Sequence, residues 1–265
     1  MKNNSLLWGV GLLLLGGLML ANAMGIRLPN GNSLTSVFWP LTFILLGVWA
    51  LVSVFWKQDV KTESASIGLD GASESKLRIH HGAGELKVHS GANPNELLHG
   101  TFDGGMEHSA ERSGNKLDVK IRSASNFWDF PFWNSNHQYN WDVALNQNIP
   151  TSLRFNIGAN KSIIALRDMN LLDLKIKAGA SDIDLILPER GRFRTDLDLG
   201  AASLTLTIPE NVSARIRASL GAADLSIDKT RFPKVNGVYQ SPDFETATNA
   251  MDIHISAGAA SIKIK

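Results

Sequence analysis

A 21-residue repeat between residues 153 and 228 constrains the fold of this chain more than any other feature. Each unit contains alternating apolar and polar residues, then Gly-Ala with a small or polar residue, then a second alternating run. The repeated glycines are Gly158, Gly179, Gly200 and Gly221. A fixed period of this size is typical of folds in which similar units stack along one axis.

The alternation has a period of two on both sides of each Gly-Ala, which predicts two short strands with one buried face. The glycine marks a corner, where a side chain would crowd the neighbouring turn or φ must be unusual. One unit buries about six apolar side chains, at roughly 1.5–3 kcal/mol each. Ordering its backbone costs roughly 1–2 kcal/mol per residue, so a unit cannot fold alone. We therefore expect an all-β domain, either a β-solenoid or a closely related roll of stacked sheets.

Two further segments fit the repeat, around Gly82 and Gly258. The interval from Gly82 to Gly158 and the interval from Gly221 to Gly258 are both longer than 21 residues, so the stack is interrupted twice. One extra alternating strand, around Val119, lies in the first interruption. The pattern predicts a β-domain over residues 76–265, with an insertion near 122–148. A Ser- and Gly-rich linker is predicted over residues 59–75.

Residues 6–24 and 37–56 are apolar and carry no charge. Each run has about the 20 residues that a helix needs to cross a bilayer. Trp8 and Trp39 lie near their ends, where amphipathic rings favour the headgroup level. The pattern predicts a two-helix transmembrane hairpin over residues 1–58, and thus a multi-pass protein of the cell membrane. Two buried core helices are the alternative.

The flanking charges bear on the side of the membrane that the β-domain occupies. The outer ends of the two apolar runs are flanked by three positive charges, Lys2, Lys57 and Lys61. The connector between the runs, residues 25–36, contains a single charged residue, Arg27. The positive-inside rule then favours cytoplasmic termini and a cytoplasmic β-domain. However, residues 21–23 read Ala-Asn-Ala, which matches a signal-peptide cleavage site, and cleavage there would place the β-domain outside. Both placements stay open, with the cytoplasmic one favoured.

Aromatic residues gather inside the first interruption, around Pro131. Aromatic side chains dominate the energetics of interfaces, and exposed apolar patches mark contact surfaces. One interpretation is a membrane or partner contact. The other is a loop that folds back and caps one end of the stack. The residues are Phe127, Trp128, Phe130, Phe132, Trp133, Tyr139 and Trp141.

Composition narrows the class of function. The chain has 26 basic and 25 acidic residues and a net charge of +1, without the clustered positive charge of a nucleic-acid-binding protein. It contains no cysteine, which excludes disulfides and Cys-ligated metals. No histidine is spaced from carboxylates as a metal ligand would be, so we expect no cofactor and no metal.

Four exposed aspartates are the candidates for a carbohydrate-cleaving site: Asp182, Asp184, Asp196 and Asp198. For that activity they would have to surround one groove. Lys175 and Arg217 fall in the column of Asp196 at the 21-residue step, so ion pairs between turns explain the charges more simply. We therefore expect a protein that is not an enzyme.

Two parts of the sequence resemble known families. Residues 11–22, a short loop and then Phe38-Trp39-Pro40 with a second glycine at 47 resemble the LiaI/LiaF-type transmembrane region. The repeats resemble the β-rich region of LiaF-like cell-envelope stress proteins and related toast-rack or adhesin-type domains. The Leu-Pro or Ile-Pro pairs that end strands at Pro150, Pro188 and Pro209 are part of this resemblance. The resemblance implies a bacterial membrane protein that senses or modulates envelope stress, in LiaF by restraining a membrane histidine kinase. This chain departs from the family by its single helix hairpin and by the aromatic insertion at 126–141.

The leading functional hypothesis is a non-enzymatic, membrane-anchored regulatory or scaffold protein that contacts a membrane histidine kinase or another envelope protein. The alternative is an exported cell-surface or adhesion-type β-solenoid. The sequence names no specific partner, signal or oligomeric state.

Overall fold

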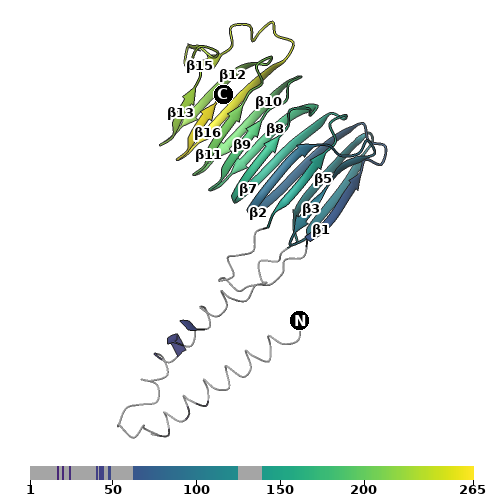
Figure 1. Cartoon of the computed structure of the whole chain (residues 1–265), viewed down its shortest axis with the longest axis vertical. Coiled ribbons are helices and arrows are strands. Elements are labelled where there is room, and N and C mark those ends of the chain that lie inside the picture. The colour runs from purple at the N-terminus through teal and green to yellow at the C-terminus, as the bar shows by residue number, and fades with distance from the viewer. Residues whose placement is uncertain are drawn as a thin grey trace. The chain divides into compact units, whose positions relative to one another are not determined.

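The computed structural model describes residues 62–124 and 139–265, together with residues 17, 20, 24, 40, 42–44, 47 and 48. The two long ranges form 17 β-strands that stack side by side (Figure 1). Backbone hydrogen bonds connect every strand to a neighbour. The predicted β-solenoid-like roll of stacked sheets is therefore confirmed for the described residues.

The first sheet is parallel through its centre and antiparallel at both ends. It includes only the N-terminal parts of the long strands β2 and β7. Its order is β4 (Met106–Ser113), β5 (Lys116–Ser123), β2 (Glu74–Ser90), β7 (Thr151–Ala165), β8 (Leu171–Ala178), β10 (Arg192–Leu199), β16 (Ala250–Ala257), β12 (Ser213–Leu220), β15 (Val238–Gln240) and β14 (Lys234–Val235).

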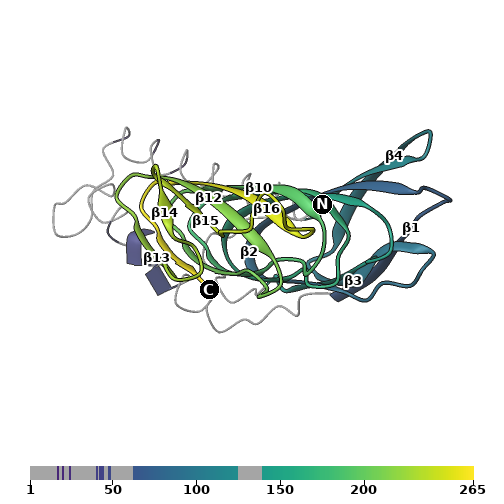
Figure 2. The same ribbon diagram turned by 90° about the horizontal axis from the view of Figure 1, so that it is seen from above.

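The second sheet contains the C-terminal parts of β2 and β7, because both strands bend at a corner and enter both sheets. β1 and β4 lie at the same end of the stack but in different sheets (Figure 2). The order is β1 (Thr62–Gly68), β3 (Glu96–Asp103), β6 (Trp141–Leu145), β2, β7, β9 (Asp182–Ile186), β11 (Ser203–Thr207), β17 (Ser261–Ile264) and β13 (Asp224–Ile227).

The core lies between the two sheets and is built by the alternation that the sequence shows. In β8, Leu174 and Ile176 are each 1% exposed, whereas Lys175 and Lys177 between and after them point outward. The same pattern recurs in each central strand, so one continuous apolar core runs through the stack. The outward residues form straight rows, since parallel strands in register place equivalent side chains beside one another.

The six predicted corner glycines form one row, which we call the corner row. Its order is Gly82, Gly158, Gly179, Gly200, Gly258 and Gly221. A Cβ on Gly179, Gly200 or Gly258 would lie 3.0–3.1 Å from the carbonyl oxygen of the preceding glycine in the row. Close approach of backbones, rather than an unusual φ, therefore explains the glycines at these corners.

The order of the corners corrects one feature of the predicted solenoid. β16 and β17 come last in the chain, yet they insert between β10–β11 and β12–β13. The longer interval before Gly258 explains the exchange. Between β13 and β16 the chain forms the β14–β15 hairpin, which pairs with β12 at the end of the first sheet. The chain then returns into the gap, so sequence order and spatial order differ.

The predicted linker at 59–75 is also corrected, because β1 and the start of β2 lie within it. β4 was missed for a related reason. Every residue of β4 after Met106 is exposed, so it has no apolar alternation. Strands at the ends of the sheets contribute few side chains to the core and leave little hydrophobic pattern in the sequence.

The predicted two-helix transmembrane hairpin requires a correction as well. Most of residues 6–24 and 37–56 lie outside the described residues. Among the residues that the structure does describe, no helix is long and apolar enough to cross a bilayer. The prediction rested on run length and hydropathy, and it needed a continuous helix of about 20 residues. Residues 62–124 and 139–265 form an all-β fold, and the multi-pass membrane localisation is not supported.

Candidate binding surfaces

Two of the seven aromatic residues predicted as contacts lie in the described ranges. Trp141 begins β6 and is 1% exposed. Its ring packs edge-on against Phe102 and tilted against His81, each at 5.1 Å between ring centroids. Trp141 is thus a core side chain rather than part of a contact surface. The other five lie outside the described residues: Phe127, Trp128, Phe130, Phe132 and Trp133.

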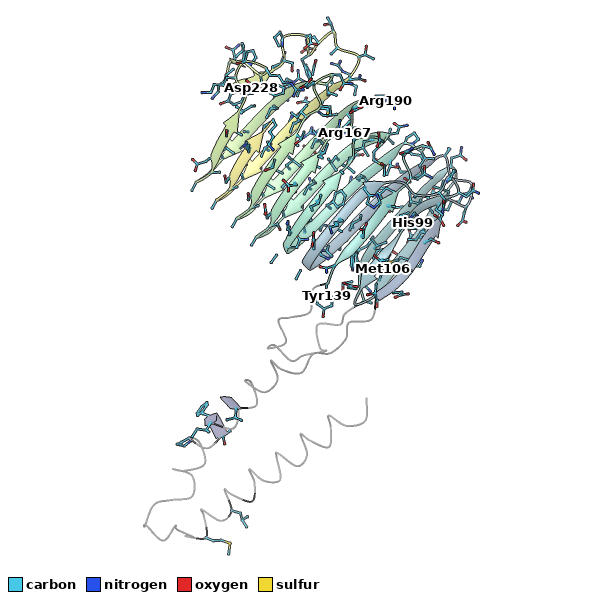
Figure 3. The ribbon with its side chains drawn as sticks, in the orientation of Figure 1. His99, Met106, Tyr139, Arg167, Arg190 and Asp228 are labelled. Atoms are coloured by element: carbon cyan, nitrogen blue, oxygen red, sulfur yellow. The ribbon has the colours of Figure 1, made fainter. Side chains whose placement is uncertain are left out.

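Tyr139 joins the aromatic segment to the fold at a fixed point, at the lower margin of the β-unit in Figure 3. The Nε2 atom of His81 donates to its carbonyl oxygen at 3.0 Å. The amide of Asn160 donates to Nδ1 of the same imidazole at 2.8 Å. A Cβ on Gly84, whose φ is +105°, would lie 2.8 Å from the carbonyl carbon of Tyr139. A glycine is therefore required where the returning chain packs against β2.

His81 is buried and uncharged in this arrangement. It is 2% exposed. Burial lowers the pKa of His81 below its ordinary value of 6.5, and the hydrogen bond to Tyr139 opposes that shift only in part. With Nε2 donating to a carbonyl, Nδ1 accepts from Asn160, which matches the neutral ring. We call these two hydrogen bonds of His81, to Tyr139 and Asn160, the His81 anchor. Protonation of Nδ1 would break the bond from Asn160.

Charged side chains on the first sheet pair between neighbouring strands. Asp252 on β16 accepts from Arg215 and Arg217 on β12, both at 2.7 Å. Burial alone would raise the pKa of Asp252, but the hydrogen bonds and charges of the two arginines outweigh it and lower that pKa. Lys175 on β8 lies 3.7 Å from Asp198 on β10. Ion pairs between turns are therefore present as predicted, but with other partners than Asp196. Lys175 lies near Asp198, and Arg217 pairs with Asp252 because β16 intervenes.

The four candidate aspartates for carbohydrate cleavage do not share a surface. Asp182 and Asp184 lie on β9 in the second sheet, whereas Asp196 and Asp198 lie on β10 in the first. The core separates the two pairs, so they cannot act on one bond. Within the described ranges, no group of three His, Asp or Glu side chains is arranged to hold a metal ion.

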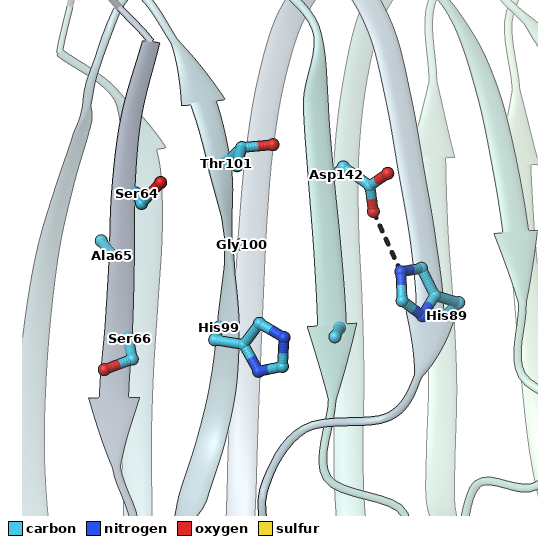
Figure 4. A pocket seen from close by; sticks show the side chains of 9 residues that line it. Ser64, Ala65, Ser66, His89, His99, Gly100, Thr101 and Asp142 are labelled. Carbon is cyan, nitrogen blue, oxygen red and sulfur yellow. Dashed lines mark hydrogen bonds and ion pairs between the residues drawn. The ribbon is translucent and has the colours of Figure 1, made fainter.

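A hollow of about 490 Å³ opens on the outer face of the second sheet (Figure 4). Its sides include His99, His89 and Asp142, and its floor includes Gly100 and Ala144. The Nε2 atom of His89 lies 2.9 Å from the Asp142 carboxylate and links β2 to β6. Sequence reasoning did not find this site. The signal is a set of small outward residues on three strands, which only the register brings together: Ser64 and Ser66 on β1, Thr101 on β3 and Ala144 on β6.

A second hollow, of about 510 Å³, follows the corner row beside the first sheet. Its floor includes Gly82, Gly158 and Gly179, and His80 and Lys177 border it. Burial lowers the pKa of His80, and the positive charges of Lys120, Arg78 and Arg122 lower it further. The potential on this part of the first sheet is therefore positive.

One of two comparisons with solved structures supports the fold, that with the protein from Clostridium sporogenes. A candidate cell adhesion protein from Clostridium sporogenes has 22% sequence identity and a TM-score of 0.70 over 78% of this chain and 99% of that one. A candidate adhesin from Bacteroides fragilis has 8% identity and a TM-score of 0.26, covering 79% of this chain and 98% of its own. No curated protein matches the sequence.

The sequence also matches a family model. The N-terminal domain of toast_rack, DUF2154, matches residues 56–207. This range contains β1 to β11 and four of the six corner glycines. It covers more than half of the chain, and the chain therefore belongs to the family defined by the N-terminal toast_rack domain.

Proposed function

We propose that this protein is a non-enzymatic scaffold that acts through protein–protein contacts in bacterial cell-envelope stress sensing or signalling. The supporting observation is the geometry of its outer faces. Parallel strands in register hold outward side chains in straight rows, and the continuous core beneath fixes the rows in place. Such a preorganised face binds a partner without the entropic cost of ordering itself.

The arrangement of acidic side chains supports the non-enzymatic part of the proposal. Two carboxylates that act on one glycosidic bond lie about 5–10 Å apart. Here the four candidates are divided between two sheets, and on β10 Asp196 and Asp198 lie in ion pairs with Arg194 and Lys175. Asp252 accepts hydrogen bonds from two arginines and stays ionised, which suits a structural ion pair rather than a proton donor.

A membrane histidine kinase is the partner class that the resemblance to LiaF-like proteins supports. The test is a strain that lacks this protein and carries a transcriptional reporter of envelope stress. We expect reporter output to change severalfold on deletion and to return with the wild-type gene. Complementation by a variant with Asp182→Asn and Asp196→Asn should also succeed. An unchanged reporter in the deletion strain would contradict the signalling role, and failure of the folded aspartate variant would contradict the non-enzymatic role.

Cell adhesion is the second candidate, favoured by the fold shared with the candidate cell adhesion protein from Clostridium sporogenes. The same deletion strain separates the two proposals. An adhesion role predicts weaker attachment of cells to surfaces or to one another, with the reporter unchanged. A signalling role predicts the opposite pair of results.

A further inference from the structure

Four basic residues lie side by side on four neighbouring strands of the first sheet. Lys120 on β5 is opposite Arg78 on β2, and Arg78 is opposite Arg154 on β7. Arg154 is in turn opposite Lys175 on β8. All four side chains point outward. We call Lys120, Arg78, Arg154 and Lys175 the basic row.

Like charges in directly opposite positions of a sheet repel one another and destabilise it. Neighbouring strands are about 4.7–4.9 Å apart, so the repulsion acts three times along the row. Two of the four cations have a carboxylate partner. Arg78 donates to Asp118 at 2.6 Å, and Lys175 lies 3.7 Å from Asp198.

Arg154 is the centre of the uncompensated charge. It is exposed, it lies between Arg78 and Lys175, and it has no acidic partner among the residues that the structure describes. In the next outward row, Arg122 and Lys177 add positive charge beside the hollow along the corner row. Burial is the largest cause of the lowered pKa of His80 in this hollow, and the positive charges of Lys120, Arg78 and Arg122 lower it further.

We propose that the basic row is a docking site for an acidic segment of a partner protein, laid across β5, β2, β7 and β8. This inference rests on the proposed scaffold function and identifies the chemistry of the partner. Carboxylates of the segment would be the acidic partners of Arg154 and Lys120. The guanidinium groups suit this role, since Arg binds carboxylates in a fixed fork geometry, and Arg78 already holds Asp118 through two nitrogen atoms.

A protein segment fits this surface better than nucleic acid. Domains that bind nucleic acid commonly have a pI above 9, whereas the pI of this chain is about 8.0. Single-stranded nucleic acids also stack their bases on aromatic side chains. The outward residues of the four strands include no Phe, Tyr or Trp. The basic row therefore binds its partner through charge, and it suits carboxylates spaced along an extended peptide.

The test uses the full chain and a fluorescein-labelled 12-residue peptide of alternating Glu and Ser, with a Gln–Ser peptide as the neutral control. Fluorescence anisotropy at low salt should show binding of the acidic peptide only. We expect Arg154→Glu to weaken binding at least tenfold. The same substitution should raise the thermal midpoint by about 2–4 °C, since it places a carboxylate between two cations. A gain in stability with a loss of binding separates docking from a structural role.

Arg194→Gln is the matched control, because Arg194 lies on the same sheet but pairs with Asp196 at 2.8 Å outside the basic row. Peptide binding should survive this change. No peptide binding at low salt, or equal binding by the Arg154→Glu variant, would overturn the proposal. Tighter binding of single-stranded DNA or polyphosphate of equal charge would overturn it in favour of a phosphate polymer. Full complementation of the stress reporter by Arg154→Glu would overturn the docking site and leave the scaffold function intact.

Discussion

Gly258 stacks directly on Gly200, although Gly221 lies between them in the chain. A Cβ on Gly258 would lie 3.1 Å from the carbonyl oxygen of Gly200, and one on Gly221 would lie 2.9 Å from that of Gly258. The last segment of the chain is therefore an interior layer of the stack, and the segment before it is the end layer. Stability should follow this spatial order.

Ile264 and Ile227 test that order, because they are opposite each other on β17 and β13. Ile264 is 3% exposed, whereas Ile227 is half-buried in the end layer. Ile264→Ala should lower the free energy of unfolding by about 2–5 kcal/mol. Ile227→Ala should cost clearly less. Urea unfolding of both variants measures the difference, and a larger loss from Ile227→Ala would contradict the interior position of β17.

The corner row makes a second prediction. A Cβ on Gly158 would overlap the backbone of Gly82, whereas a Cβ on Gly82 would meet nothing within 4 Å. Gly158→Ala must move backbone in a packed stack, so we expect a loss of about 1–3 kcal/mol. Gly82→Ala is the matched control and should change stability little. Thermal unfolding of both variants is the measurement, and equal losses would show that close approach is not the reason for glycine.

The strands in the centre of the stack were predicted well from the sequence, because their side chains alternate between core and solvent with a fixed period. Phe155, Ile176 and Leu197 fall in one predicted column, and all three are buried. The ends of the stack could not be predicted, since β4 has almost no buried side chains. The spatial order of β16–β17 and β12–β13 could not be predicted either. A repeat predicts the strands of each layer but does not say which layers are neighbours in the stack.

The basic row shows the same limit for function. Arg154 and Lys175 are 21 residues apart, so the repeat alone places them side by side. Arg78 and Lys120 join them through the pairings of β2 with β7 and with β5. Those pairings connect segments across the irregular interruption, where no period applies. The register of long-range strand pairs therefore had to come from the structure.

Asp252→Asn tests the ion pairs between turns. The change leaves Arg215 and Arg217 without their shared carboxylate, and we expect a loss of about 1–2 kcal/mol at neutral pH. The pKa of Asp252 in the fold is below its ordinary value of 3.8. Its contribution to stability is therefore present above that value and lost as pH falls through the folded pKa. Urea unfolding at pH 7 and near pH 3 measures both effects, and an equal loss at the two pH values would contradict them.

Trp141→Ala tests whether this aromatic residue belongs to the core or to a contact surface. Its ring is buried against Phe102 and His81, so removal should cost about 3–5 kcal/mol. Trp128→Ala decides between the two interpretations of the aromatic segment, since a contact surface predicts a nearly unchanged free energy of unfolding and a cap predicts a loss. Urea unfolding compares the two variants. Normal stability of Trp141→Ala would contradict its place in the core.

The His81 anchor predicts a dependence of stability on pH. Its pKa in the fold is below the ordinary value of 6.5, so the unfolded state binds more protons between the two values. Stability is then fully present above about pH 6.5 and falls as pH decreases toward the folded pKa.

His81→Gln removes the titrating ring but keeps a donor for the Tyr139 carbonyl. We expect this variant to lose part of the pH dependence between about pH 6.5 and pH 5. His80 contributes with the same sign, so some dependence should remain. Urea unfolding across this pH range is the measurement, and an unchanged profile for His81→Gln would show that the buried imidazole is not the group that titrates.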